Sequence, residues 1–172
     1  MIATTERHPL VVDIQIAVAK NIEIPAEQEL IKWANAAYLG AVQKVDAAEV
    51  TIRFVDVTEI TELNSRYRNQ AKATNVLSFP VDDLATELLM DPTVTFDEEW
   101  PNRLLGDLII CSEVVISEAK NAQKSVMSHY AHMVTHGILH LCGYDHVDEF
   151  EAEQMEALEV DILATQGIAN PY

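Results

Sequence analysis

The sequence predicts one domain of mixed α and β structure, α/β or α+β, in which a single sheet packs against several helices. Two observations predict this class. The length of 172 residues fits one domain or at most two small ones. Segments with strand-like and helix-like patterns are also mixed along the chain, which is typical of layered α and β folds. No apolar run is long enough to span a membrane, so we expect no membrane partner.

Two strands and two helices are expected in the first 70 residues. Residues 10–18 are rich in β-branched side chains and partly alternate, as strands do. Pro25 lies near the start of a helical pattern with one apolar face, and Gly40 is expected to end that helix. Residues 49–57 alternate cleanly between apolar and polar side chains, which predicts a strand with one buried face. Thr58 is expected to cap the short helix that follows.

The remaining chain predicts two further strands and three helices. Residues 75–81 form a short strand that Pro80 ends or keeps at the sheet edge. Residues 82–104 are acidic and lack a clear period, which indicates a long surface loop. Residues 106–111 form a buried apolar strand. The three helices are expected over residues 112–124, 127–142 and about 147–166.

The charge of the chain is strongly acidic but unevenly distributed. With 28 Asp and Glu against 11 Lys and Arg, the net charge of −17 taken alone argues against a protein that coats nucleic acid or binds an anionic membrane surface. Two segments, 81–100 and 145–161, together hold 15 acids and no Lys or Arg. The other residues hold 13 acids and 11 bases, so this nearly neutral part of the chain can still form a local basic cleft.

Two cysteines indicate the redox compartment. Cys111 and Cys142 stand in apolar surroundings and neither belongs to a CxxC pair, so we expect reduced thiols in the core. The first residues lack the pattern of a secretion signal. These features predict a cytoplasmic protein.

Five of the six histidines lie between residues 129 and 146. His136 and His140 are four residues apart on a predicted helix, so their imidazoles share one face. Gly143 suits the left-handed conformation that ends a helix, after which the chain can return His146 to the same point. Three imidazoles and a water form the usual open, catalytic Zn²⁺ site. The pattern therefore predicts one Zn²⁺ per chain, and the alternative is a helix with incidental histidines.

Other residues of this segment are less suitable as ligands. His132 and His140 are eight residues apart, about 12 Å along a helix, whereas two ligands of one zinc lie about 3.4 Å apart. His132 and His129 are therefore expected to pack, to support the ligands or to face solvent. Cys142 follows His140 by two residues and would point about 200° away on a helix, so it is not expected to be a fourth ligand.

The residue after the first ligand differs from the common H-E-x-x-H zinc motif. That motif places a Glu general base there, whereas this chain has Gly137. Water would be activated by the metal alone, by another carboxylate or by the substrate. Asp107 and Asp145 are candidates to accept a hydrogen bond from a ligand histidine.

One segment resembles the signature of the bacterial YbeY proteins, the zinc-dependent endoribonucleases of rRNA maturation: His136-Gly-Ile-Leu-His140-Leu-Cys-Gly-Tyr-Asp-His146. Further blocks match that family in order, most clearly over residues 48–172. They are Leu63-Asn64, Tyr67-Arg68, Thr74-Asn-Val-Leu-Ser-Phe-Pro80, Leu105-Gly-Asp-Leu-Ile-Ile-Cys111, Ala131-His-Met-Val134 and Glu151-Ala-Glu-Gln-Met-Glu156.

The resemblance implies a fold and a set of site residues. The fold is a single α+β domain over residues 1–172, with one mixed, mostly four-stranded sheet and a zincin-like arrangement of the metal-binding helix. Arg68 is implied as the catalytic arginine that contacts phosphate, which suits its planar, permanently charged guanidinium. The implied metal ligands are His136, His140 and His146, and the residues expected around them or in the cleft are Ser78, Asp107 and Asp145.

The function implied is a metal-dependent endoribonuclease, specific for single strands, in 16S rRNA 3′-end maturation and ribosome quality control. Its partners would be rRNA or a ribosomal subunit, with ribosomal proteins or a ribosome-associated GTPase. Either water or the RNA 2′-OH would attack the phosphate. Two alternatives remain at this point, a zinc-dependent peptidase-like hydrolase and a non-catalytic ribosome-associated zinc protein. Because of the acidic charge, we expect RNA binding by the isolated protein to be weak and only slightly salt-dependent.

Overall fold

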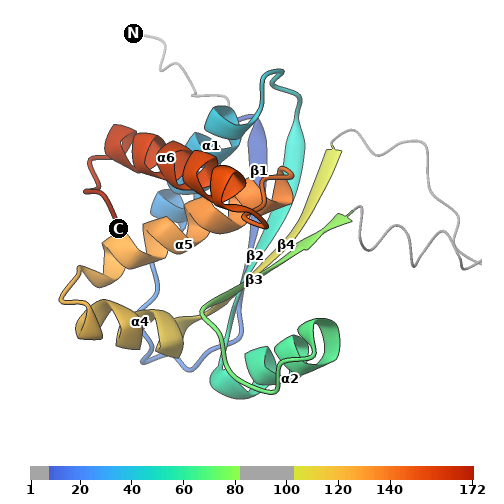
Figure 1. Cartoon of the computed structure of the whole chain (residues 1–172). Helices are drawn as coiled ribbons and strands as arrows, with labels where there is room; N and C mark the ends of the chain where they lie inside the picture. Colours follow the sequence, from blue (N-terminus) through green and yellow to red (C-terminus); the bar gives the residue numbers. More distant parts are fainter. Residues whose placement is uncertain (1–7, 82–102) are drawn as a thin grey trace, which may run out of the picture.

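The computed structural model describes residues 8–81 and 103–172 and shows one sheet with helices on both of its faces (Figure 1). In chain order the elements are β1 Leu10–Ile16, α1 Glu27–Ala41, β2 Ala48–Val55, α2 Val57–Arg68, β3 Val76–Pro80, β4 Arg103–Cys111, α4 Ser112–Asn121, α5 Val126–Leu141 and α6 Glu149–Thr165. This arrangement confirms the α+β class and the mixed four-stranded sheet. The loop predicted over 82–104 lies outside the described residues, except that Arg103 and Leu104 open β4.

The strand order in the sheet is β1-β2-β4-β3. β1 pairs with β2 and β2 with β4 in parallel, whereas β3 runs antiparallel to β4. Parallel neighbours need a crossover connection, which α1 supplies between β1 and β2. β3 is an edge strand, as expected from Pro80 at its end. Proline has no backbone N–H to donate to a neighbouring strand, so it is found at sheet edges and strand ends.

The two faces of the sheet are covered unequally. Helices α1, α5 and α6 lie over one face, while α2 lies on the other side near the lower end of the sheet in Figure 1. The main core forms under the first group and includes Ile52, Phe54, Leu108 and Ile110 of the central strands. A smaller cluster forms between α2 and the sheet, from Val55, Ile60, Leu77, Ile109 and Cys111. Strand alternation explains the split, because successive side chains face opposite sides.

Two predicted helix ends were wrong, and each has a structural reason. Asp56, not Thr58, caps α2, because its carboxylate accepts the N–H of Glu59 at 2.8 Å. Gly40 does not end α1, which continues to Ala41. A Cβ on Gly40 would lie 2.8 Å from the side chain of Ile162, so this glycine allows α6 to approach α1 closely.

Other local expectations are confirmed. Gly143 follows α5 with φ +98°, the left-handed conformation that lets the chain turn back. Cys111 is buried and Cys142 is partly buried against the main core. Burial raises the pKa of the Cys142 thiol to about 11, although the charge of Arg103 opposes this. Within the described residues, no helix is both long and apolar enough to cross a membrane.

Candidate metal centre

Helix α5 carries two of the predicted ligands and lies unusually close to the sheet. Ser125 caps its start by accepting the N–H of Ser128 at 3.4 Å. A Cβ on Gly137 would lie 2.1 Å from Cδ1 of Leu108 on β4, so only glycine fits there without displacing the leucine. Position 137 therefore faces the sheet, and this packing explains why the chain lacks the glutamate of the common zinc motif at this position.

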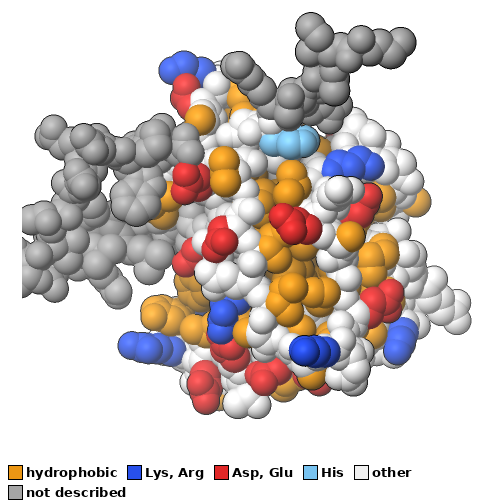
Figure 2. Space-filling model, turned by 180° about the vertical axis from the view of Figure 1, so that it is seen from behind, with side chains coloured by type: hydrophobic (Ala, Val, Ile, Leu, Met, Phe, Trp, Pro, Cys, Tyr) orange, Lys and Arg blue, Asp and Glu red, His pale blue; other side chains and the backbone are white. Residues whose placement is uncertain are grey.

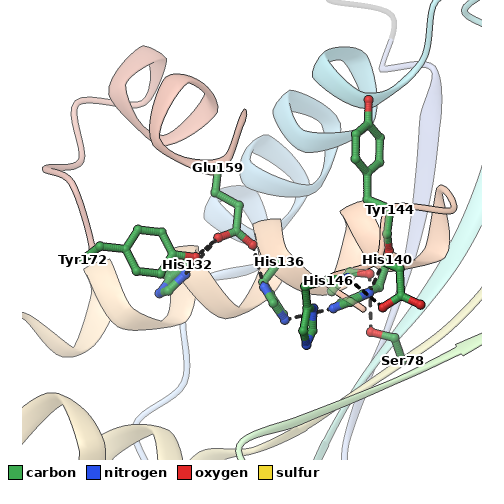
Figure 3. A network of polar contacts seen from close by, with 10 residues as sticks. Ser78, His132, His136, His140, Tyr144, His146, Glu159 and Tyr172 are labelled. Carbon is green, nitrogen blue, oxygen red and sulfur yellow. Dashed lines mark hydrogen bonds and ion pairs between the residues drawn. The ribbon is translucent and has the colours of Figure 1, made fainter. Parts of the chain in front are cut away.

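The three predicted ligand histidines converge in the structure (Figure 3). His136 and His140 project from α5, with their Nε2 atoms 3.1 Å apart. His146 comes from the turn between α5 and α6, and its ring centroid lies 5.0 Å from that of His140 and 5.8 Å from that of His136. One nitrogen of each ring lies within 4.8 Å of the other two. These separations suit imidazoles that share one metal ion.

Hydrogen bonds orient two of the three rings. Nδ1 of His140 lies 2.9 Å from the carbonyl oxygen of Tyr144, and Nδ1 of His136 lies 2.5 Å from Oε1 of Glu159. Both oxygens are acceptors, so each Nδ1 carries the hydrogen and each Nε2 keeps its lone pair. Such bonds to the non-ligating nitrogen fix the tautomer and orientation of a metal-binding histidine.

Glu159 is the centre of a polar network on the far side of His136 (Figure 3). Its side chain is fully buried, and its oxygens accept hydrogen bonds from His136, from His132 at 3.3 Å and from the phenol of Tyr172. Burial alone would raise the pKa of this carboxyl, but the three hydrogen bonds outweigh it and lower the pKa to about 2. Glu159 is therefore an ionised, fully satisfied carboxylate behind the candidate site.

The ring of His140 is held neutral. Burial lowers its pKa to about 4, and the positive charge that His136 and His146 carry when protonated acts in the same direction. A neutral imidazole is the form that binds metal ions, so the surroundings of His140 favour metal binding at neutral pH.

A cleft of about 530 Å³ opens beside the three histidines and is also lined by Arg68, Ser78 and Asp145. Nη2 of Arg68 donates to the carbonyl oxygen of Ser78 at 2.9 Å, which ties the end of α2 to β3. The Ser78 hydroxyl donates to the carbonyl oxygen of Gly137 at 3.4 Å, and Asp145 accepts the backbone N–H of His146 at 2.8 Å. The cleft thus brings together the three histidines and three of the four other predicted site residues.

Asp107 is the exception. It precedes Leu108, whose side chain packs under α5, so Asp107 points to the opposite face of the sheet. There it lines a separate hollow of about 170 Å³ with Asp13 and Leu104. Figure 2 shows the molecule from behind, where hydrophobic and acidic side chains mix and the visible Lys and Arg are scattered singly.

The role of Glu159 was not predicted from the sequence, in which it is one more acid of an acidic helix. A signal was available, because Met155 and Ile162 form the apolar stripe of α6 and Glu159 lies on the same stripe, four residues after Met155. An acid on the buried face of a helix needs a partner. His132 and His136 are its partners.

Known proteins resemble this chain over most of its length. A family model described as Endoribonuclease YbeY matches residues 14–167. Endoribonuclease YbeY of Alteromonas mediterranea is 48% identical over 152 residues, which cover 88% of this chain and 87% of the relative. Endoribonuclease YbeY of Psychromonas ingrahamii is 45% identical over 164 residues, which cover 95% of this chain and 96% of the relative.

A solved structure shows the same fold. The solution structure of TM1509 from Thermotoga maritima superposes with a TM-score of 0.53, at 21% identity, over 91% of this chain and 92% of that one. The sequence matches confirm both the family that the histidine segment resembles and the prediction of an endoribonuclease. The chain belongs to the endoribonuclease YbeY family.

Proposed function

We propose that this protein is a zinc-dependent endoribonuclease that cuts single-stranded RNA in 16S rRNA 3′-end maturation and in ribosome quality control. One observation carries the proposal: a single cleft is lined by three convergent imidazoles and by the guanidinium of Arg68. Imidazoles bind a metal ion and a guanidinium binds phosphate oxygens, so the cleft suits a phosphodiester. The relatives are named as endoribonucleases, which supports RNA as the substrate.

We assign one Zn²⁺ to His136, His140 and His146. Three imidazole ligands are the donor set of catalytic zinc sites, which keep one position open, and not of saturated structural sites. Zinc, when bound, supplies Lewis acidity that stabilises the negative charge developing on the phosphoryl group. The chain prepares its ligands through the Nδ1 hydrogen bonds of His136 and His140, which hold both Nε2 lone pairs toward the cleft side of α5.

Arg68 is proposed to bind and orient the scissile phosphate. Its planar fork matches two phosphate oxygens and stays charged at every relevant pH. The hydrogen bond to the Ser78 carbonyl restricts the side chain before substrate arrives, so less conformational freedom is lost on binding. Ser78 and Asp145 shape the walls of the same cleft. The attacking oxygen comes either from water or from the RNA 2′-OH.

The surface supports a single-stranded substrate presented by a larger assembly. A protein that follows a duplex needs a long basic face, and this chain has only 11 Lys and Arg against 28 Asp and Glu. We propose that rRNA within a ribosomal subunit is the substrate. Ribosomal proteins or a ribosome-associated GTPase would assist by contacting the acidic surface, and this setting would place the protein in the cytoplasm.

The test is cleavage of a 16S precursor 3′ end by the zinc-loaded protein and by two variants. His136→Ala should lose both zinc and cleavage. Arg68→Ala should keep zinc but lose cleavage by about 100- to 1000-fold, the usual cost of removing one preorganised charge-stabilising group. His8→Ala and Lys44→Ala remove an exposed histidine and an exposed cation elsewhere and should behave like the unaltered protein.

Wild-type cleavage by either site variant would remove that residue from the mechanism. A substrate with 2′-deoxyribose at the cleaved position separates the two nucleophiles, because its cleavage requires water as the attacking group. Annealing a complementary strand over the cleavage position should abolish cleavage, and equal cleavage of duplex and single strand would contradict the proposed specificity.

A further inference from the structure

One wall of the cleft is locally cationic in a chain that is acidic as a whole. No Asp or Glu stands between Glu62 and Asp82, although the chain has 28 acids. The acid-free segment 63–81 contains Arg66, Arg68 and Lys72, three of only 11 cations. It comprises the end of α2, the loop that follows and β3. It holds three cations, more than either of the two other long acid-free segments, 30–45 and 119–144, which hold two each.

Two aromatic rings lie within the acid-free segment. Tyr67 of α2 packs edge to face on Phe79 of β3, with ring centroids 5.2 Å apart and planes inclined at 67°. The guanidinium carbon of Arg66 lies 5.4 Å from the Tyr67 ring, and that of Arg68 lies 5.8 Å from the Phe79 ring. The two rings and the two guanidinium groups thus form one continuous cluster.

The two rings differ in burial. Phe79 is partly buried and packs on the small core under α2, so packing fixes its position. Tyr67 lies outside this small core, and 44% of its surface is exposed. The packing of α2 against β3 explains the buried Phe79 and the side of the Tyr67 ring that contacts it. It does not explain why the other side of Tyr67 is an exposed aromatic surface beside two cations. A rigid exposed ring held on an ordered neighbour is well suited to stacking.

Arg68 connects this cluster to the metal cleft. Its guanidinium lines the cleft, bonds to the carbonyl oxygen of Ser78 and lies over Phe79. β3 is an edge strand of the sheet, so within residues 8–81 and 103–172 no further strand separates its outer edge from solvent. An RNA strand whose phosphate is bound at Arg68 therefore passes directly beside the aromatic pair.

We propose that Tyr67, supported by Phe79 and flanked by Arg66, is a stacking site for one unpaired RNA base next to the phosphate held at Arg68. The inference rests on the proposed endoribonuclease function and deepens it. Aromatic side chains with adjacent cations bind single strands by stacking on the exposed face of a base, largely without regard to sequence. Both faces of a base inside a duplex are covered by the neighbouring base pairs, so the site also gives a physical reason for a single-strand preference.

The experiment combines protein variants with a set of single-stranded RNA substrates, each lacking one base near the cleaved bond. With the zinc-loaded unaltered protein, loss of the base at one position should raise KM by about 5- to 100-fold, the range for one stacked base, and change kcat little. Tyr67→Leu should raise KM for the intact RNA by the same factor, and removal of that base should then have no further effect. Tyr67→Phe keeps the ring and should retain the native pattern.

Two controls separate stacking from a folding defect. Phe150→Leu removes an aromatic that is 67% exposed on α6, outside the acid-free segment, and should leave the position-specific effect intact. Zinc content and thermal unfolding of Tyr67→Leu report on its fold. If Tyr67→Leu merely damages the cleft, its activity should fall alike on every RNA of the set. If the variant lacks a stacking site, its activity should no longer depend on the base at that one position.

The outcomes distinguish this site from the function on which it rests. Native KM values for Tyr67→Leu, or a persisting effect of base removal in that variant, would overturn the stacking site and leave the nuclease intact. Uniform loss across the set with lost zinc or lowered thermal stability would also overturn it in favour of a structural role. Failure of the unaltered protein to cut any RNA would overturn the proposed function and this site with it.

Discussion

Oε1 of Glu159 on α6 lies 2.5 Å from Nδ1 of His136 on α5, a bond between a fully buried carboxylate and a candidate metal ligand. The other oxygen of the same carboxylate, Oε2, accepts hydrogen bonds from Nε2 of His132 and from the hydroxyl of Tyr172. Burying a carboxylate is costly unless its acceptors are satisfied, and here three donors satisfy them. The packing of α6 on α5 is therefore coupled to the orientation of the His136 ring.

Glu159→Gln should weaken zinc binding by about 10- to 100-fold, because the charge that orients and polarises His136 is lost while the side-chain volume is kept. Competition with a chelator of known affinity measures the change. Glu153→Gln on the exposed side of α6 is the matched control and should bind zinc like the unaltered protein. An unchanged affinity in Glu159→Gln would show that the hydrogen bond does not support the metal ligand.

The metal-free protein should lose stability as the pH falls from about 6.5 to about 4. The folded pKa of His140 is about 4, below its ordinary value of 6.5, so the unfolded chain binds more protons within this window. The loss from this residue is at most about 3 to 4 kcal/mol, at about 1.4 kcal/mol per pH unit over about 2.5 units. Urea unfolding with chelator at pH 7, 5.5 and 4.5 measures it.

His140→Asn should lack that pH dependence between 6.5 and 4, while retaining any contribution from other groups. Below pH 4.5 the loss of charge on Glu159, whose folded pKa is about 2, should destabilise both proteins further. Identical curves for the two proteins above pH 4.5 would contradict the assignment to His140.

Gly137→Ala should destabilise the protein by about 1–2 kcal/mol, although alanine is the better helix former. The added Cβ would overlap Leu108, which has no exposed surface and little room to move. In a Leu108→Ala background the same substitution should be neutral or stabilising, because the overlap is gone. Denaturant unfolding of the four proteins gives the coupling, and simple additivity would show that α5 does not contact β4 in this way.

Cys142 should react slowly with iodoacetamide in the folded protein. Its pKa of about 11, raised by burial, leaves a thiolate fraction at pH 8 roughly 100-fold smaller than that of an ordinary thiol. The rate is measured in a Cys111→Ala background, with the same protein in urea as the fast reference. Cys142→Ala should keep one zinc per chain, and a loss of zinc would make this thiol a ligand after all.

The local pattern of the chain was enough for much of the fold and for the metal ligands. Alternation over β2 and the helical period of α5 depend on neighbouring residues, so both elements were predicted within one or two positions. The ligand set also depends on near neighbours, because His136 and His140 share a helix face and Gly143 permits the turn that returns His146. Where a helix end depended on a distant contact, as at Gly40 beside Ile162, the local pattern was misleading.

The sequence by itself determined the α and β elements, the convergence of three histidines and the family that they resemble. Only the tertiary structure decided that Asp107 faces away from the cleft, that Gly137 faces Leu108 and that Glu159 lies behind His136. Strand alternation turns Asp107 from the site, and the close approach of α5 and α6 sets the other two contacts. Contacts between segments tens of residues apart arise from packing of the whole chain, which periodicity along a single element does not encode.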